Sequence, residues 1–422
     1  MDGSCASSSW TLVRPSACSP SRPPPSRFYH SRNISTDEPH VVLNAPDGGG
    51  DGVLRVFLPG TGSNPLQYSC LLRAIASIDG PAIGLSYAFL PAADAQRNAL
   101  CASIYSLPAA IARCLAHQHS DALFGGSREP QLWPPTDHED SVQGRLSLLL
   151  RSLASGNTAW SAYLDADGTT PLWERVWIGG HSQGAGHAAY LAATVALAGA
   201  TLLSGPQDAC LGCRVVQRLW LDERAWATRG AIHALAHANE SAAEVIQENW
   251  VRMATSGGLV GWSSSSSSEE GGVAYDIGFG LEVPSNSNSA PWITRVRPSN
   301  LLRCGGRPYH CSTAKDSTTP IASTLMDDGG RKALYELAVW PRLWQADAAA
   351  LPPSSPPPST IGTSVAAVGL LGVVAGAIVG CCAAFRCGRV CRRLRKRPAT
   401  RPVVREFQMS AAAALGVDLP RL

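Results

Sequence analysis

One stretch decides the fold of this chain: Val176-Trp177-Ile178-Gly179-Gly180-His181-Ser182-Gln183-Gly184-Ala185-Gly186. β-Branched and aromatic residues lead into Gly-His-Ser-Gln-Gly, and Ala- and Leu-rich sequence typical of a helix follows directly. In that context G-x-S-x-G indicates a nucleophile elbow, a strained strand-to-helix turn that holds a serine hydroxyl above the edge of a sheet. A Cβ at Gly180 or Gly184 would clash with the strand or the helix. We predict that Ser182 is a nucleophile and that the N–H of Gln183 faces the oxyanion.

Strand-like and helix-like patterns alternate over residues 51–345, which predicts a mostly parallel sheet with helices on both faces, the α/β-hydrolase fold. Besides the strand before Ser182, the expected strands span 54–58, 82–87, 200–204 and 231–236. The expected helices include 66–78, 142–153 and a final one at 331–339. Two polar stretches, 116–140 and the serine-rich 263–268, are candidate surface loops or lids.

The composition fits one large domain with appendages. Hydrophobic residues make up 45% of the 422 residues, enough for a core, while 31 prolines and 40 glycines indicate unstructured stretches as well. The net charge of +3 is small, and much of the excess lies in one C-terminal cluster. The body of the chain therefore gives no support to a nucleic-acid partner.

The chain has 13 cysteines, and their spacing does not reveal how they pair. Those in the expected globular part are Cys70, Cys101, Cys114, Cys210, Cys213, Cys304 and Cys311. The C-x-x-C formed by Cys210 and Cys213 lacks a second pair or suitably spaced histidines, so a short disulfide or two thiols are favoured over a metal. We expect neither a metal nor a cofactor.

The segment 1–50 is rich in Ser, Pro and Arg and shows little apolar periodicity, which predicts disorder. Its apolar run Trp10-Thr11-Leu12-Val13 is too short for the core of a secretory signal. Few acidic residues with many Ser and Arg are compatible with an organellar transit peptide. A plain disordered tail or a misassigned start codon is the alternative.

A serine of this kind needs a histidine to take its proton and a carboxylate to orient that histidine. On this fold the chain order is serine, acid, histidine. Among the histidines after Ser182, His187 and His233 fall in a helix and a strand and are interpreted as packing residues, while His237 precedes the best acid. His310 lies late in the chain in an expected loop, so it is the predicted general base.

Two acids remain open for the third role. Glu240 ends the strand predicted two after the elbow, where this topology usually supplies the acid, and Asp208 ends the strand before it, a position that some relatives use. We favour Glu240. Asn239 begins the glycosylation sequon Asn239-Glu240-Ser241, and a glycan there would crowd Glu240, so the two interpretations compete.

The second oxyanion donor is expected from the loop after the first core strand. Pro59-Gly60-Thr61-Gly62 fits because glycines allow the backbone to approach a substrate, and the N–H of Thr61 is the favoured donor. A glycine-rich turn without a catalytic role is the alternative.

Residues 346–360 form a Pro-rich linker, and residues 361–385 carry no charge and are long enough to cross a bilayer as a helix. The tail 386–422 opens with a cluster of Arg and Lys, which predicts a cytosolic tail and an extracellular or lumenal body. The sequon at Asn33 is consistent with that route, whereas no secretory signal is recognisable.

The apolar segment carries two further signals. Its glycines at Gly372, Gly376 and Gly380 recur every four residues, a spacing that lets two such helices approach closely in a homodimer; a merely Gly- and Ala-rich segment is the alternative. Cysteines at its cytosolic boundary are candidates for palmitoylation or are inert thiols. They are Cys381, Cys382, Cys387 and Cys391.

Four motifs occur in the same order as in the BPSS1187-like group of uncharacterised α/β-hydrolase-like proteins, which residues 50–345 resemble. The motifs are Val56–Gly62, the Gly-His-Ser-Gln-Gly-Ala-Gly-His run, Leu203–Asp208 and His310–Thr313. The resemblance implies an α/β-hydrolase fold and a serine hydrolase triad, and it implies no substrate. A glutamate at position 240, where aspartate is commoner, keeps Asp208 in consideration.

These observations predict a membrane-anchored serine hydrolase that cleaves an ester or related acyl bond of a small molecule or lipid. A catalytically silent α/β-hydrolase domain that serves as a membrane-anchored binding module is one alternative. An acyltransferase with the same triad is another, since the two enzymes differ only in which hydroxyl reaches the acyl-enzyme.

Overall fold

The computed structural model describes residues 10–18, 26–29, 32–35, 37–43, 52–78, 80–88, 94–126, 135–209, 220–221, 226–228, 232–256, 275–276, 291–327, 330–333, 335–336 and 339–345. All of them belong to one of the two units into which the chain divides, Met1–Pro352. The second unit, Pro353–Leu422, contains none of them.

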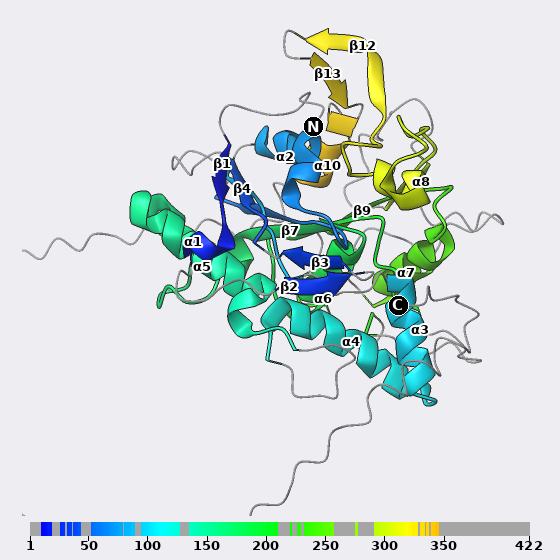
Figure 1. Ribbon diagram of the computed structural model, residues 1–422, viewed down its shortest axis with the longest axis horizontal. Helices are drawn as coiled ribbons and strands as arrows, with labels where there is room; N and C mark the ends of the chain where they lie inside the picture. Colours follow the sequence, from blue (N-terminus) through cyan, green and yellow to red (C-terminus); the bar gives the residue numbers. More distant parts are fainter. Residues whose placement is uncertain are drawn as a thin grey trace, which may run out of the picture. The chain divides into compact units, whose positions relative to one another are not determined.

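A nine-stranded sheet, visible at the centre of Figure 1, organises this unit, with the strand order β1-β4-β6-β5-β7-β8-β9-β11-β10. From β6 to β10 every neighbouring pair is parallel, whereas β1 and β4 add antiparallel strands at one edge. The strands of this sheet are β1 (Thr11–Val13), β4 (His40–Leu43), β5 (Leu54–Leu58), β6 (Ala82–Gly84), β7 (Val176–His181), β8 (Gly199–Leu203), β9 (Ile232–His237), β10 (Tyr275–Asp276) and β11 (Trp292–Thr294). Two separate hairpins pair β2 (Ser26–Tyr29) with β3 (Arg32–Ser35) and β12 (Ile321–Asp327) with β13 (Gly330–Ala333).

The order of the strands locates the functional edge of the sheet. After β5 the chain crosses to β6 on one side and later returns to β7 on the other side of β5. In open parallel sheets ligands bind beyond the carboxyl ends of the strands at such a switch point. Because β7 ends at the serine-bearing turn, the mostly parallel sheet and its order give an α/β-hydrolase-like fold, as the sequence predicts.

Helices cover both faces of the sheet. On one face α6 packs against β7 and β8, and α4 packs against α6, α5 and α3. On the other face α2 packs against β6 and α10 packs against α2. The helices are α1 (Pro15–Cys18), α2 (Ser69–Ala76), α3 (Asp94–Ile104), α4 (Pro108–Phe124), α5 (Val142–Gly156), α6 (Gln183–Thr194), α7 (Ala243–Thr255), α8 (Pro308–Ser312) and α10 (Trp340–Leu343). Short 3₁₀ turns lie at η1 (Pro65–Tyr68), η2 (His138–Asp140), η3 (Thr158–Tyr163), η4 (Trp173–Arg175) and η5 (Cys304–Gly306).

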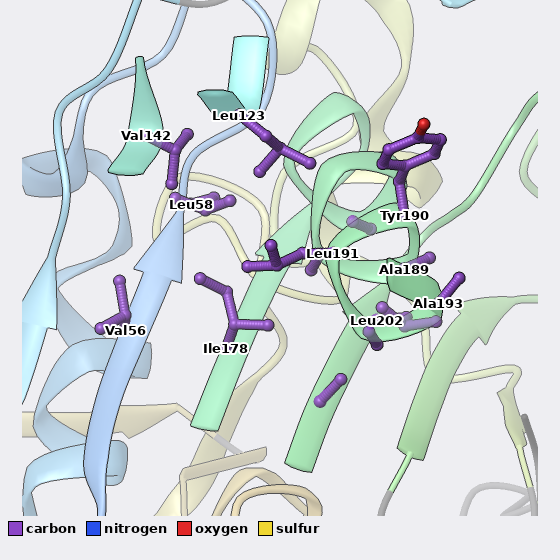
Figure 2. Close-up of a cluster of buried hydrophobic side chains, with 14 of the residues drawn as sticks. Val56, Leu58, Leu123, Val142, Ile178, Ala189, Tyr190, Leu191, Ala193 and Leu202 are labelled. Atoms are coloured by element: carbon purple, nitrogen blue, oxygen red, sulfur yellow. The ribbon is translucent and has the colours of Figure 1, made fainter. Parts of the chain in front are cut away.

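The strand period of two divides the core between the two faces. In β5, Val56 and Leu58 belong to the cluster under α4, α5 and α6, while Phe57 belongs to the cluster on the opposite face. Figure 2 shows the first cluster, in which Ile178 of β7 and Leu191 of α6 meet with no exposed surface. A central strand buried on both faces is expected to be almost entirely apolar. The exception in β5 is the buried Arg55, whose Nε donates to Trp344 O at 3.1 Å.

The N-terminal segment differs from its prediction. Residues 1–50 were expected to be disordered, yet β1 and β4 are two strands of the main sheet, and His40 to Leu43 are buried. The reason is that β4 pairs with β6, about forty residues along the chain, and β1 pairs with β4. Strands of three and four residues carry too few positions for periodicity to reveal them.

Three further predictions need correction. Residues 116–124 of the expected polar stretch form the second half of α4. Residues 330–333 are strand β13 rather than part of a final helix, and the last helix among the described residues is α10. His310 lies on the short helix α8 rather than in a loop. Proline at the first position of α8 and a single turn of helix explain why the sequence pattern resembles a loop.

The predictions for 346–360, 361–385 and 386–422 lie outside the described residues, as do those for 263–268 and for Cys210 and Cys213. None of the helices formed by the described residues combines the length and apolar character that a bilayer crossing requires.

Candidate active site

Ser182 lies between β7 and α6 in a conformation that few residues adopt, with φ 55° and ψ −119°. The surrounding structure holds this strain, because the N–H of Ser182 donates to Leu203 O at 2.8 Å. Its carbonyl accepts from the N–H groups of Ala185 and Gly186 at 2.9 and 3.1 Å. The residue remains partly exposed.

The two glycines of the motif are required by close approaches of the backbone. A Cβ on Gly180 would collide with the backbone of Gly184, and a Cβ on Gly184 would collide with the carbonyl oxygen of Leu58 at the end of β5. The predicted elbow is therefore present, and it is packed directly against the switch point of the sheet.

The loop after β5 lies against this elbow. A Cβ on Gly60 would stand 3.2 Å from Ser182 Cβ. Tyr87 Oη donates to Pro59 O at 2.9 Å, and the N–H of Gly60 donates to Tyr68 Oη at 3.1 Å. These bonds fix the orientation of the loop and engage the N–H of Gly60, so that the next N–H in the chain, that of Thr61, is the candidate donor toward a substrate.

His310 approaches the elbow from α8. Its ring centroid lies 4.8 Å from that of His181, the residue before Ser182, and 8% of the residue is exposed. Its backbone carbonyl accepts hydrogen bonds from His181 Nε2 and Ser204 Oγ, each at 3.0 Å. The ends of two neighbouring strands, β7 and β8, therefore hold the backbone of His310.

Glu240 is the acid that contacts this histidine. Its Oε2 lies 2.7 Å from His310 Nδ1, and its Oε1 accepts from the N–H of His237 at 3.1 Å. Glu240 is 5% exposed, whereas its neighbour Asn239 is exposed. The contact between Glu240 and His310 is therefore compatible with an exposed glycosylation sequon that begins at Asn239.

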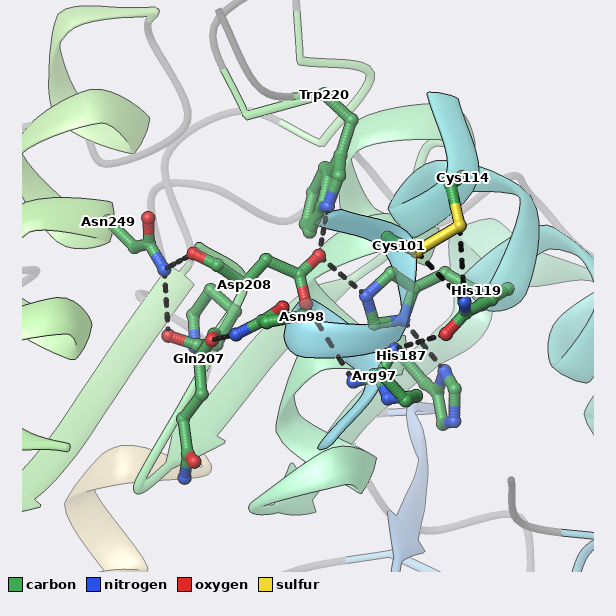
Figure 3. Close-up of polar contacts among 12 residues, drawn as sticks. Arg97, Asn98, Cys101, Cys114, His119, His187, Gln207, Asp208, Trp220 and Asn249 are labelled. Atoms are coloured by element: carbon green, nitrogen blue, oxygen red, sulfur yellow. Dashed lines mark hydrogen bonds and ion pairs between the residues drawn. A yellow bond between two sulfur atoms is a disulfide. The ribbon is translucent and has the colours of Figure 1, made fainter. Parts of the chain in front are cut away.

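Asp208 has different partners, which Figure 3 shows. Its Oδ2 lies 2.9 Å from His119 Nε2 and accepts from Trp220 Nε1, and Arg97 lies 3.7 Å from its Oδ1. Burial raises the pKa of Asp208, but the charges of His119 and Arg97 and the hydrogen bonds outweigh it and lower that pKa to about 2. Asp208 is therefore the carboxylate of a buried ionic network beneath α6.

The same network contains a histidine that sequence reasoning assigned to packing and one that it did not consider. His187 Nδ1 lies 2.9 Å from His119 Nδ1, and both residues are fully buried. Burial, followed by the charges of His119 and Arg97, holds the pKa of His187 well below its usual value. His187 is thus a neutral core residue, as predicted, and nothing in the local sequence around His119 marks its partnership with Asp208.

The hydroxyl of Ser182 and the imidazole of His310 share no hydrogen bond in the described part of the chain. In enzymes without substrate such contacts are often long, and they tighten when the substrate binds. Across the ranges that the structure describes, no group of three or more His, Cys, Asp or Glu side chains could hold a metal ion.

Disulfides join Cys101 to Cys114 and Cys304 to Cys311. The first links α3 to α4, and the second spans the turn that leads into α8 and ends beside His310. Both pairings were open from the sequence.

The chain is similar to known proteins among the solved structures. No family model matches the chain, and no curated protein matches it in sequence. Among solved structures, the chain resembles a carboxylesterase of Bacillus cereus at 17% identity and a TM-score of 0.28, covering 52% of this chain and 80% of that one. It also resembles a carboxylesterase of Mesorhizobium loti (14% identity, TM-score 0.28, covering 52% and 81%) and a thermostable esterase of Pseudomonas putida (11% identity, TM-score 0.28, covering 59% and 71%).

Proposed function

We propose that this protein is a serine hydrolase that cleaves an ester or related acyl bond through an acyl-enzyme. The observation that carries the proposal is the arrangement of His310. Its side chain contacts the Glu240 carboxylate at 2.7 Å, while its backbone is bonded at 3.0 Å to His181, the residue before Ser182. An imidazole oriented by a buried carboxylate beside an elbow serine is the arrangement that acyl transfer needs.

The proposed mechanism follows from these positions. Ser182 Oγ attacks the substrate carbonyl, and its proton passes to His310 Nε2. Glu240 holds the Nδ1–H tautomer and stabilises the imidazolium that forms. The N–H groups of Thr61 and Gln183 stabilise the oxyanion, the latter at the N-terminus of α6 where the helix dipole favours negative charge. His310 Nε2 then gives this proton to the leaving alcohol oxygen as the bond between that oxygen and the carbonyl carbon breaks, which leaves the acyl group on Ser182 Oγ. Water next attacks the acyl carbon while His310 Nε2 takes a proton from it, and transfer of that proton to Ser182 Oγ releases the carboxylic acid and restores the serine.

Glu240 is favoured over Asp208 as the acid because the two carboxylates contact different histidines, and only the histidine of Glu240 lies at the elbow. The Glu240 partner lies at the elbow, and the Asp208 partner, His119, lies in the buried network under α6. The order of the four motifs supports membership of the BPSS1187-like group as part of the same proposal.

We further propose that residues 361–385 anchor the enzyme in a membrane, with the hydrolase domain extracellular or lumenal and the tail 386–422 cytosolic. The uncharged segment followed by a basic cluster supports this orientation. Two disulfides in the described residues support an oxidising compartment for the domain. The same proposal includes a homodimer in which two of these membrane segments pair through Gly372, Gly376 and Gly380. It also includes a small-molecule or lipid acyl substrate.

The test is hydrolysis of a panel of p-nitrophenyl esters of increasing acyl length by the full chain in detergent. The proposal predicts turnover by the wild type that Ser182→Ala abolishes while the thermal unfolding midpoint stays unchanged. A binding module would show no turnover with any ester. An acyltransferase would release p-nitrophenol faster when a second alcohol is added than in water alone.

A further inference from the structure

Two side chains connect the oxyanion loop to the general base. The N–H of Gly60 lies 3.1 Å from Tyr68 Oη, Tyr68 Oη lies 3.0 Å from His181 Nδ1, and His181 Nε2 lies 3.0 Å from His310 O. Tyr68 has no exposed surface and His181 is 2% exposed. All three bonds are buried, and they join β5, η1, β7 and α8 at the edge of the sheet.

The chemistry of its ends fixes the direction of every bond. A backbone N–H can only donate and a carbonyl can only accept, so His181 carries its proton on Nε2. Nδ1 of the neutral ring then accepts from the Tyr68 hydroxyl, whose lone pair accepts from Gly60. Burial and the charge of His310 hold the pKa of His181 well below its usual value, which keeps the ring neutral.

The bonds at both ends determine geometry that catalysis depends on. At one end Tyr68 accepts the N–H of Gly60, the residue that precedes the proposed oxyanion donor Thr61. At the other end His181 shares the carbonyl of His310 with Ser204 Oγ, which sets the position of the α8 turn. A displacement of about 1 Å in either group can cost on the order of a hundredfold in rate.

We propose that Tyr68 and His181 are positioning residues, which keep the oxyanion loop and the His310 imidazole in register with each other. The inference rests on the proposed function, because it concerns the same site. It assigns a role to the histidine of Gly-His-Ser, a residue that contributes nothing to the triad itself.

The test compares Tyr68→Phe with a matched control, Tyr335→Phe. Tyr335 is equally buried, and its hydroxyl bonds to Thr294 Oγ1 at 2.9 Å rather than to the loop after β5. Each variant loses one buried hydroxyl, so both are expected to lower the unfolding midpoint. Kinetics with a p-nitrophenyl ester and the rate of inactivation by a fluorophosphonate are measured at a temperature well below both midpoints.

We expect Tyr68→Phe to lower kcat and the inactivation rate about ten- to a hundredfold with little change in KM, and Tyr335→Phe to change both by less than about twofold. A second variant, His181→Gln, keeps an N–H for the carbonyl of His310 and should retain more activity than His181→Leu. Equal kinetics in Tyr68→Phe and Tyr335→Phe, with the wild type labelled at Ser182, would overturn this inference alone. Wild-type protein that is not labelled at Ser182 would overturn the proposed function, and the inference with it.

Discussion

Glu240 Oε2 lies 2.7 Å from His310 Nδ1, although the two residues are 70 positions apart in the chain. The contact forms because Glu240 follows β9 and α8 packs against β9. Its other oxygen accepts the N–H of His237, so the carboxylate is held at both ends and presents one fixed lone pair to the imidazole.

Glu240→Gln should leave the fold intact and lower kcat by about a thousandfold to ten-thousandfold, because the amide cannot stabilise an imidazolium. Asp208→Asn is the matched control. It should lower the free energy of unfolding by about 3–5 kcal/mol, since it leaves Arg97 and His119 without their counter-charge, and change kcat little. Ester hydrolysis and urea denaturation of both variants check this. The reverse pattern would assign the acid to Asp208.

Gly184→Ala should destabilise the domain by about 2–3 kcal/mol or more, because the added methyl group meets the carbonyl oxygen of Leu58. Gly156→Ala is the control: it adds the same methyl group at the end of α5, where no atom lies within 4 Å. That variant should be neutral or stabilised by about 0.5–1 kcal/mol. Urea denaturation of the pair compares them, and equal stability would contradict the close approach at the elbow.

Stability should fall in acid partly because of His40 on β4. Burial, with a smaller effect of Arg145, lowers the pKa of His40 to about 3. Its pKa in the unfolded chain is about 6.5, so between these values only the unfolded chain binds the proton. The neutral His40 therefore contributes its full share to the free energy of unfolding above pH 6.5. As the pH falls below 6.5 this free energy decreases, and the loss amounts to about 3 kcal/mol at pH 4.5.

The variant His40→Asn tests this contribution, because its amide oxygen can still accept the N–H of Ser86, which lies 3.0 Å from His40 Nδ1. Unfolding free energies of wild type and variant should converge between pH 7 and pH 4.5, with the variant losing less. Parallel curves would show that His40 is not buried as a neutral ring, and the N-terminal strand would then not belong to the sheet.

The disulfide between Cys101 and Cys114 should stabilise the fold by about 3 kcal/mol, because it closes a loop with a sequence separation of 13. The double variant Cys101→Ala with Cys114→Ala should lower the free energy of unfolding by that amount while kcat stays within about twofold. Mass spectrometry of the non-reduced wild-type protein identifies the linked peptides. Two free thiols at these positions in protein from its native compartment would contradict the pairing.

The parts of the fold that the sequence could predict are those where local pattern and global structure agree. The elbow was predictable because Gly180, Ser182 and Gly184 satisfy a backbone requirement that few sequences meet. The buried strand β5 was predictable because Leu54 and the apolar run Val56-Phe57-Leu58 end in a Pro-Gly turn. These elements fix the switch point of the sheet and thereby the position of Ser182.

The choice of acid lay beyond the sequence. Glu240 and Asp208 each follow a parallel strand, and each is buried against a histidine. Which histidine reaches which carboxylate depends on how α4 and α8 pack, and no local spacing reports that. The contact between Tyr68 and His181 likewise depends on packing between distant segments. Strands β1 and β4 were also beyond the sequence, because they are stabilised by pairing with distant strands rather than by their own propensity.

The most direct measurement of the central claim is mass spectrometry of the full chain after reaction with a fluorophosphonate, with peptide mapping of the modified residue. The proposed function predicts one adduct per chain, on the peptide that contains Ser182, and no adduct in Ser182→Ala of unchanged stability. An unmodified wild-type protein that is folded, or an adduct on another serine that survives in Ser182→Ala, would contradict it.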